Sequence, residues 1–302
     1  MGKTVKETIK DIVYSHLKVK KHKAFGQCLS AVGWVGGTLP ELYEKDGMIE
    51  LSMADVAGGG IVVGAALTGD RPIYVIRYQG FNWFNCPIIL NYACKSKEIW
   101  NVPCPIFIRG IAMEGGIGPV AGSSHHSLYY RMPGIKIASP MTPKEYLQVY
   151  NKFEKDDSVY YVSEHRGSYL NENELNDINQ SNPEVTVFAI SVTRFEALKA
   201  AKILEKKNIK VNFFNILWIK PFKIKDAWIK SINRSKFSII LDDDYKDGVG
   251  SSLANKLMQV SKKKVYPYGL DDRSAGFSKY RDNLPPQSSK IIDIILKLRK
   301  KK

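Results

Sequence analysis

Residues 48–67 read MIELSMADVAGGGIVVGAAL, a short apolar run followed at once by a segment of small residues. The run Met48–Leu51 is typical of a strand and the segment Asp55–Thr68 of a helix, so the stretch predicts a strand–helix unit. Asp55 stands where that helix begins. An ionised carboxylate among apolar neighbours is costly unless it is paired, so this residue needs an explanation.

Two interpretations of Asp55 are open from the residues alone. Aspartate is among the best N-cap residues, so Asp55 can simply cap the helix. The helix also carries Gly58, Gly59, Gly60 and Gly64, and each glycine costs about 1 kcal/mol of helix propensity. Those glycines are better explained if another backbone or a flat ligand comes close. That interpretation makes Asp55 a functional acid.

The same alternation of short apolar runs and helical stretches continues through the first half of the chain, and it predicts a mostly parallel sheet covered on both faces. The predicted strands are Ala24–Leu29, Met48–Leu51, Ile73–Tyr78, Pro105–Ile111, Ile135–Ala138 and Val159–Ser163. The predicted helices between them are Leu39–Lys45, Asp55–Thr68, Phe84–Ile99 and Pro143–Lys155.

The second half repeats this pattern after a polar, turn-rich stretch. That stretch, HRGSYLNENELNDINQSNPE, has few apolar anchors and resembles a linker. Beyond it, strand-like and helix-like runs alternate again from VTVFAIS to the final helix near Gln287–Leu298. We therefore expect two doubly wound α/β domains, at residues 1–170 and 185–302, with a linker at 171–184.

Composition narrows the class of protein. The 302 residues are 44% apolar and carry a net charge of +15, but the lysines are spread out and no nucleic-acid motif accompanies them. The charge therefore favours a solvated surface, without a nucleic-acid partner. No run is long enough to span a membrane, the N-terminus reads as an amphipathic helix instead of a signal peptide, and the four cysteines lack C-x-x-C spacing. We expect a reduced, cytoplasmic setting.

Two further segments carry candidate site residues. The segment GSSHHSLYYRMPG, residues 122–134, places His125 and His126 in a polar loop after a strand, which suits acid–base chemistry. As metal ligands these histidines lack partners at suitable spacing, so no metal site is predicted. The segment YQGFNWF, residues 78–84, begins with Tyr78 and includes Phe81. Its aromatic rings suit core packing and suit equally the wall of a site for a ring-shaped ligand.

Taken in order, these segments resemble a known family, the beta subunit of the thiamine-diphosphate-dependent decarboxylating component of 2-oxoacid dehydrogenases, and more broadly the second half of transketolase-like enzymes. The resemblance runs from Ala24 to Leu298. Its segments are FGQCLSAVGWVGGTLPELYEKDGMIELSMAD, NYACK, VPCPIFIRG, HHS with PGIKIASPMTPKE, ILWIKPF and IILDDDYKDGVGSSLANKL. Each motif alone is weak, and their shared order and spacing make the set specific.

The resemblance implies a transketolase-like pyrimidine-binding domain followed by a transketolase C-terminal-like domain. It places Asp55 at the family's glutamate, which hydrogen-bonds the aminopyrimidine ring of thiamine diphosphate and so prepares the cofactor to attack a 2-oxo group. Such an acid is expected to be shielded from water. Tyr78 and Phe81 are then cofactor-binding residues. His125 or His126 faces the substrate, and the spacing leaves open which of the two does so.

The sequence departs from the family pattern at the site. Aspartate is one methylene shorter than glutamate, a reach deficit of roughly 1.5 Å, and a misplacement of about 1 Å can cost on the order of 100-fold in rate. Gln27 replaces the acid of the family's G-E-D motif, and Val75 stands where the family often has glutamate.

The chain also lacks the G-D-G motif through which such enzymes hold Mg²⁺ and the cofactor's diphosphate. By resemblance, an alpha subunit carries that site, in an alpha2-beta2 heterotetramer that passes an acyl group to a lipoyl acyltransferase or another acceptor. Two alternatives stay open. One is the C-terminal half of a split transketolase-like or carboligase enzyme, and the other is a non-catalytic assembly subunit.

Overall fold

The structure is a computed structural model that describes residues 2–114 and 122–300. The chain divides into two compact units. The described part of the first comprises residues 2–113 and 122–174, and that of the second comprises residue 114 and residues 175–300. Within these described ranges, no helix combines the length and the apolar character needed to cross a lipid bilayer. Both units have the parallel α/β architecture expected from the alternating pattern.

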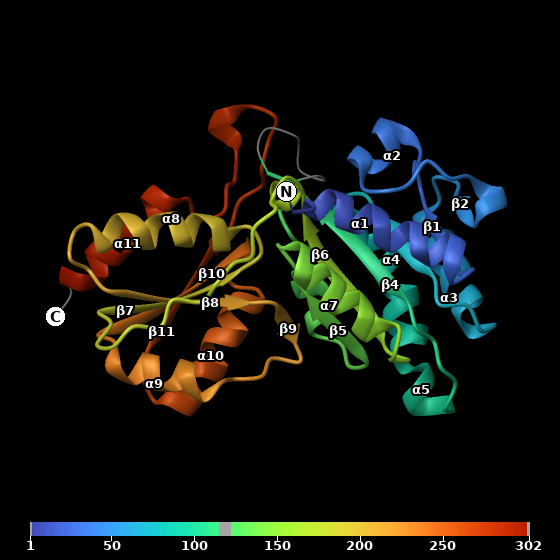
Figure 1. Ribbon diagram of the computed structural model, residues 1–302. Helices are drawn as coiled ribbons and strands as arrows, with labels where there is room; N and C mark the ends of the chain where they lie inside the picture. Colours follow the sequence, from blue (N-terminus) through green and yellow to red (C-terminus); the bar gives the residue numbers. More distant parts are fainter. Residues whose placement is uncertain (1, 115–121, 301–302) are drawn as a thin grey trace. The chain divides into compact units, whose positions relative to one another are not determined.

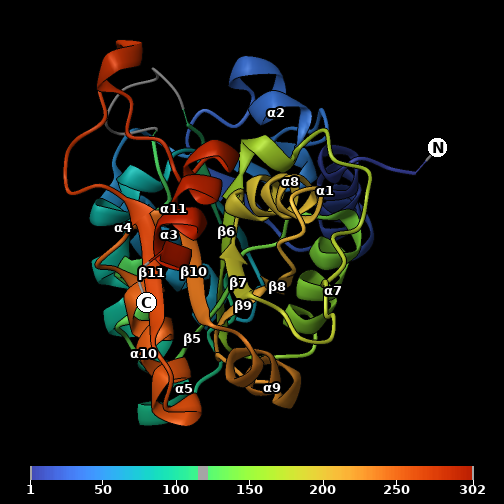
Figure 2. The ribbon, with the colours of Figure 1, turned by 90° about the vertical axis from the view of Figure 1, so that its left-hand side faces the viewer.

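The first unit is built on parallel strands in the order β2-β1-β3-β4-β6-β5. Helices cover both faces of this sheet, with α1 and α7 on one side and α3 and α4 on the other (Figures 1 and 2). Its strands are β1 (Ala24–Gly26), β2 (Met48–Glu50), β3 (Ile73–Ile76), β4 (Phe107–Ala112), β5 (Ile135–Ala138) and β6 (Val159–His165). Its α-helices are α1 (Val5–Tyr14), α2 (Ala31–Gly37), α3 (Asp55–Leu67), α4 (Asn82–Ile88), α5 (Cys94–Trp100), α6 (Ser127–Tyr130) and α7 (Pro143–Phe153).

The second unit has a four-stranded parallel sheet in the order β11-β10-β7-β8. Helices α8 and α11 cover one face of it and α9 and α10 the other (Figures 1 and 2). The strands of this sheet are β7 (Val185–Ile190), β8 (Val211–Ile216), β10 (Phe237–Tyr245) and β11 (Val265–Leu270), and the short strand β9 (Trp218–Lys220) lies outside it. The α-helices of the unit are α8 (Thr193–Glu205), α9 (Asp226–Arg234), α10 (Val249–Ser261) and α11 (Ser288–Lys300).

Most predicted elements are present, within a few residues of their expected ends. The amphipathic N-terminal helix is α1, which begins with a capping box between Thr4 and Glu7 and buries Val5, Ile9 and Ile12. The stretch expected as one helix over Phe84–Ile99 is helical from α4 to α5, with a π-helical turn at Ile89–Ala93 between them. The short strand β9 was not predicted.

The helix predicted at Leu39–Lys45 is wrong. Only a 3-10 turn at Glu44–Asp46 forms there, because Pro40 supplies no backbone N–H and Asp46 accepts a bond from the Tyr43 backbone at 3.2 Å. Such local side-chain bonding competes with helix formation. The preceding segment, α2 at Ala31–Gly37, is not a regular right-handed helix, because φ is positive at each residue from 32 to 36.

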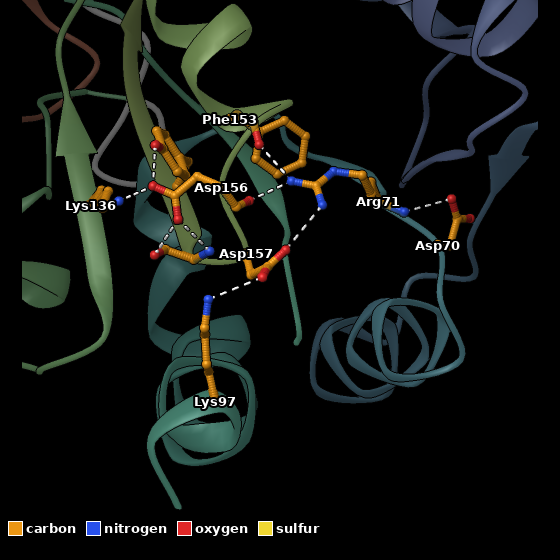
Figure 3. A network of polar contacts seen from close by, with 9 residues as sticks. Asp70, Arg71, Lys97, Lys136, Phe153, Asp156 and Asp157 are labelled. Carbon is orange, nitrogen blue, oxygen red and sulfur yellow. Dashed lines mark hydrogen bonds and ion pairs between the residues drawn. The ribbon is translucent and has the colours of Figure 1, made fainter. Parts of the chain in front are cut away.

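A polar network joins the ends of several elements at the edge of the first sheet where β3, β5 and β6 begin (Figure 3). Arg71 is its hub and donates to the carbonyl oxygens of Phe153, at 2.6 Å, and of Asp156. Its other terminal nitrogen lies 3.4 Å from Asp157, which also pairs with Lys97 at 3.0 Å. The network therefore holds the start of β3 against the loop between α7 and β6.

Candidate functional site

A pocket of about 540 Å³, counting its open mouth, lies at the carboxyl ends of β1 and β3 in the first unit. In open parallel sheets this is the edge at which ligands usually bind. The walls are mostly apolar, and they include three of the residues predicted for the site. The lining residues are Gln27, Cys28, Met53, Asp55, Tyr74, Val75, Ile76, Arg77, Tyr78, Phe81 and Asn85.

Asp55 is the acid of this pocket. It is the first residue of α3, and the N-cap position belongs to Ala54, so the capping interpretation of Asp55 is not what the structure shows. Its Oδ1 accepts hydrogen bonds from the side-chain amides of Gln27 at 3.1 Å and Asn85 at 3.4 Å. Among the described residues none donates to Oδ2, so that oxygen is available to a ligand.

The surroundings of Asp55 are wetter than expected. The sequence predicted a carboxylate shielded from water, but Asp55 is half-buried in this chain, because the pocket that it lines opens to solvent. The expectation of a fully buried acid is therefore wrong for the chain by itself. The charge is instead held by the two amide donors, which suits a carboxylate at a pocket wall.

A chain of hydrogen bonds fixes the donors around Asp55. The hydroxyl of Tyr74, on β3, donates to Asn85 Oδ1, and the Asn85 amide also donates to the Phe81 carbonyl at 3.1 Å. Burial of Tyr74, together with the charge of Asp55, raises the pKa of this phenol well above its ordinary value. Tyr74 therefore stays a neutral donor that orients Asn85 toward the acid.

One of the α3 glycines explains the packing at this wall. A methyl group at Gly58 would come within 3.2 Å of the Tyr74 hydroxyl and 3.3 Å of the Leu51 side chain, tighter than side-chain carbons normally approach. No described atom would lie within 4 Å of such a methyl group at Gly60 or Gly64. Close approach of a neighbouring element therefore accounts for Gly58, whereas Gly60 and Gly64 have open space around them.

Aromatic rings form the wall next to Asp55. Tyr78 is the second residue after β3, and its ring centroid lies 6.0 Å from that of Phe81, with 50° between the ring planes. Both were predicted as cofactor-binding residues, and both line the pocket with Asp55. An apolar wall beside an acid with one oxygen not bonded by the described residues suits an aminopyrimidine ring, which needs a flat apolar surface and one acid.

The two predicted histidines occupy a neighbouring part of the same sheet edge, and neither belongs to the pocket lining. Gln79 connects the two regions. Its buried amide donates to the Gly110 carbonyl and to Ser163 Oγ, both at 3.0 Å, and its oxygen accepts from the His125 backbone at 2.6 Å. His126 is fully buried, with Nδ1 3.0 Å from Ser163 Oγ, whereas His125 is half-buried.

Sequence reasoning missed several of these residues. Tyr74 was assigned only to a strand, and Asn85 and Arg77 were not singled out. Gln27 was noticed as a departure from the family motif, although its bond to Asp55 was not foreseen. Their positions relative to the predicted strands could have indicated them, since polar residues that directly follow neighbouring parallel strands meet at one edge of the sheet.

Two parallel α/β units, with a mostly apolar pocket at the carboxyl ends of the strands, place the chain among doubly wound α/β proteins. The chain belongs to the transketolase family: the transketolase pyrimidine-binding domain model matches residues 9–171, and the transketolase C-terminal domain model matches residues 176–280. The expected family and fold class are both confirmed. Proteins of this family depend on thiamine diphosphate.

Among similar proteins, the 2-oxoisovalerate dehydrogenase subunit beta of Bacillus subtilis is 26% identical over 247 residues, covering 74% of this chain and 73% of the relative. The pyruvate dehydrogenase E1 component subunit beta of Rickettsia bellii is 23% identical over 280 residues, covering 85% and 84%. A solved structure described as a split gene transketolase, inactive beta4 tetramer, covers 98% of each chain with a TM-score of 0.74 at 14% identity.

Proposed function

We propose that this chain is the beta subunit of a thiamine-diphosphate-dependent 2-oxoacid dehydrogenase, the component that decarboxylates a 2-oxoacid and passes the acyl group to a lipoyl or other acceptor. The observation that carries the proposal is Asp55, whose carboxylate lines an aromatic-walled pocket with one oxygen not bonded by the described residues. The beta-subunit names of the similar proteins support it.

In this proposal Asp55 Oδ2 holds the pyrimidine ring of the cofactor, and Tyr78 and Phe81 flank that ring. The bound cofactor supplies an electron sink for decarboxylation. Gln27 and Asn85 keep Asp55 oriented, because their amide N–H groups donate to its Oδ1 and leave Oδ2 to the ring. Glutamine at position 27 therefore gives Asp55 an amide donor where the family motif has an acid.

The proposal also requires a partner. The sequence has no G-D-G motif, so an alpha subunit would hold Mg²⁺ and the diphosphate in an alpha2-beta2 heterotetramer. Either histidine of the His125–His126 pair remains a candidate for the substrate-facing residue, and we expect the enzyme to act in the cytoplasm. The acceptor of the acyl group, a lipoyl acyltransferase in the expected case, would bind the assembled enzyme.

The test is reconstitution with a candidate alpha chain, using the Asp55→Asn variant. The change keeps the size of the side chain and removes its charge, so turnover should fall by on the order of 100-fold or more with an unchanged circular dichroism spectrum. Calorimetry should show tight thiamine diphosphate binding for the complex and little for this chain by itself. Tight binding by the isolated chain would contradict the shared site.

A second candidate is the C-terminal half of a split transketolase-like enzyme. The end-to-end match with the split gene transketolase favours it, since that structure and this chain cover 98% of each other. Transfer of a two-carbon unit between sugars by the reconstituted complex, with no oxidation of 2-oxoacids, would select this candidate. The third candidate, a non-catalytic assembly subunit, requires that Asp55→Asn leave the activity of the complex unchanged.

A further inference from the structure

Two arginines converge on one aromatic ring beside the pocket. The guanidinium carbon of Arg77 lies 5.7 Å from the Tyr78 ring centroid, and that of Arg166 lies 5.6 Å from the same centroid. Arg77 is the first residue after β3 and Arg166 the first after β6, with β4 between those strands. Two strand spacings amount to about 10 Å, so the backbones of Arg77 and Arg166 lie about that far apart. Both side chains nevertheless reach the ring of Tyr78.

No residue that the structure describes neutralises the charges of Arg77 and Arg166. The Nε of Arg77 and both Nε and Nη2 of Arg166 are buried and have no hydrogen-bond partner among the residues that the structure describes. No described carboxylate forms an ion pair with either arginine, in contrast to Arg109 and Arg71, which each pair with an acid. Buried guanidinium N–H groups are normally satisfied, so unpaired ones require an explanation such as an absent ligand.

Stacking on Tyr78 does not explain the pair. A cation–π contact accounts for the position of a single arginine over a ring, but it satisfies none of the N–H donors. It also gives no reason to bring a second positive charge to the same ring, because two guanidinium groups repel each other. An anion within reach of these guanidinium groups would satisfy the donors and offset the positive charge, and the planar fork of guanidinium matches carboxylate and phosphate.

We propose that Arg77 and Arg166 form a subsite for the anionic group of the substrate, a carboxylate or a phosphate. The inference rests on the proposed function, in which Asp55 marks the cofactor end of the pocket. Arg77 lines that pocket together with Asp55 and Tyr78, so the arginines orient the anionic group of the substrate relative to a cofactor held at Asp55. They are positioning and specificity residues, and the reacting atoms need not touch them.

The direct test uses the full chain without cofactor or partner subunit, so it stays readable if the proposed function is wrong. The side-chain Nε–H resonances of Arg77 and Arg166 are followed by NMR while inorganic phosphate is added, and in a separate series pyruvate. Both resonances should shift along one saturation curve, and Arg77→Gln or Arg166→Gln should weaken binding about 10- to 100-fold. The exposed Arg234→Gln variant is the control and should leave binding unchanged.

The stronger of the two titrants identifies the source of the anion. Tighter pyruvate binding assigns the subsite to the carboxylate of a 2-oxoacid, and tighter phosphate binding assigns it to a phosphorylated substrate. The inference is overturned if neither resonance moves with either anion, or if the two arginine variants bind as the unmodified chain does.

Kinetics of the reconstituted complex give a second readout. Loss of either arginine should raise KM by about 10- to 100-fold with little change in kcat, as expected for an interaction made equally in ground and transition states. The affinity for thiamine diphosphate should not change. A fall in cofactor affinity that parallels the rise in KM would overturn the assignment, because it would place the arginines at the cofactor.

Discussion

The side-chain amide of Gln27 donates a hydrogen bond to Asp55 Oδ1 at 3.1 Å and so joins the end of β1 to the start of α3. The two residues are 28 positions apart, and only the parallel pairing of β1 with β2 and β3 brings them together. Because Asn85 is the other donor to the same oxygen, Gln27 supplies half of the hydrogen bonding that holds this carboxylate.

Replacing Gln27 tests that relationship. We expect Gln27→Ala to lower kcat/KM of the reconstituted complex by about 10-fold, because one hydrogen bond to a charged group is lost while Asn85 remains. Steady-state kinetics give the measurement. The exposed Gln148 offers a matched control, since Gln148→Ala makes the same chemical change away from the pocket. Equal activity of both variants would show that the bond to Asp55 has no functional role.

We expect His126 to contribute mainly to stability and His125 mainly to activity. His126 is fully buried and lies 3.0 Å from Ser163 Oγ, so His126→Ala should lower the melting temperature by several degrees through a cavity and a lost bond. His125 is half-buried, and His125→Ala should keep the melting temperature and cost on the order of 100-fold in turnover. Calorimetry combined with kinetics decides the assignment, and the reverse pattern would exchange the two roles.

The buried Arg109–Glu164 pair should be costly to break. Arg109 donates to both oxygens of Glu164, at 3.0 and 2.7 Å. Burial by itself would lower the pKa of Arg109, but the Glu164 carboxylate outweighs burial and leaves that pKa raised. Glu164→Gln should therefore cost about 3–5 kcal/mol of unfolding free energy, because a buried charge loses its partner.

Denaturant unfolding measures that cost, and a double replacement is its control. Arg109→Met with Glu164→Leu removes both charges, so it should recover most of the lost stability. If the single and double variants were equally unstable, packing at these positions would matter more than the charge pair.

Acid should weaken the first unit through two buried histidines. Burial, as the largest cause, lowers the pKa of both His16 and His165 to about 4, from 6.5. Between pH 6.5 and 4 the unfolded chain therefore binds more protons than the folded chain. The stability that these neutral histidines give the folded chain is fully present above pH 6.5. As the pH falls toward 4, the free energy of unfolding decreases by about 3 kcal/mol for each residue.

Melting temperatures between pH 7.5 and 4.5 test this linkage. The unmodified chain should lose stability steadily below pH 6.5, and the His16→Gln and His165→Gln variants should each show a smaller slope. The slope is the readout, so a general loss of stability in a variant does not obscure it. An unchanged slope in both variants would assign the acid sensitivity to other groups.

The network of Figure 3 offers a comparison around one acid, Asp157. Arg71→Ala removes bonds to two carbonyl oxygens as well as the ion pair, and we expect a loss of about 2–3 kcal/mol. Lys97→Ala removes only an exposed pair with the same carboxylate, which should cost less than about 0.5 kcal/mol. Similar losses for both variants in thermal unfolding would contradict this ranking.

Local sequence signals predicted most elements because each depends on residues close in the chain. The apolar runs at 73–76 and 107–112 are buried strands, and the small-residue segment after Asp55 is a helix. The failure at residues 39–45 has a local cause as well, since Pro40 and the Asp46 side chain supply turn chemistry that the apolar pattern does not reveal. The family motifs then indicated Asp55, Tyr78 and Phe81 as parts of one site.

By itself, the sequence determined the two α/β halves, the family and the position of an acid at the start of a helix. Only the tertiary structure decided which side chains surround that acid and that Arg77 and Arg166 share one ring. The reason is that strand order does not follow chain order. The first sheet runs β2-β1-β3-β4-β6-β5, and periodicity encodes which face a residue takes but not which strand becomes its neighbour.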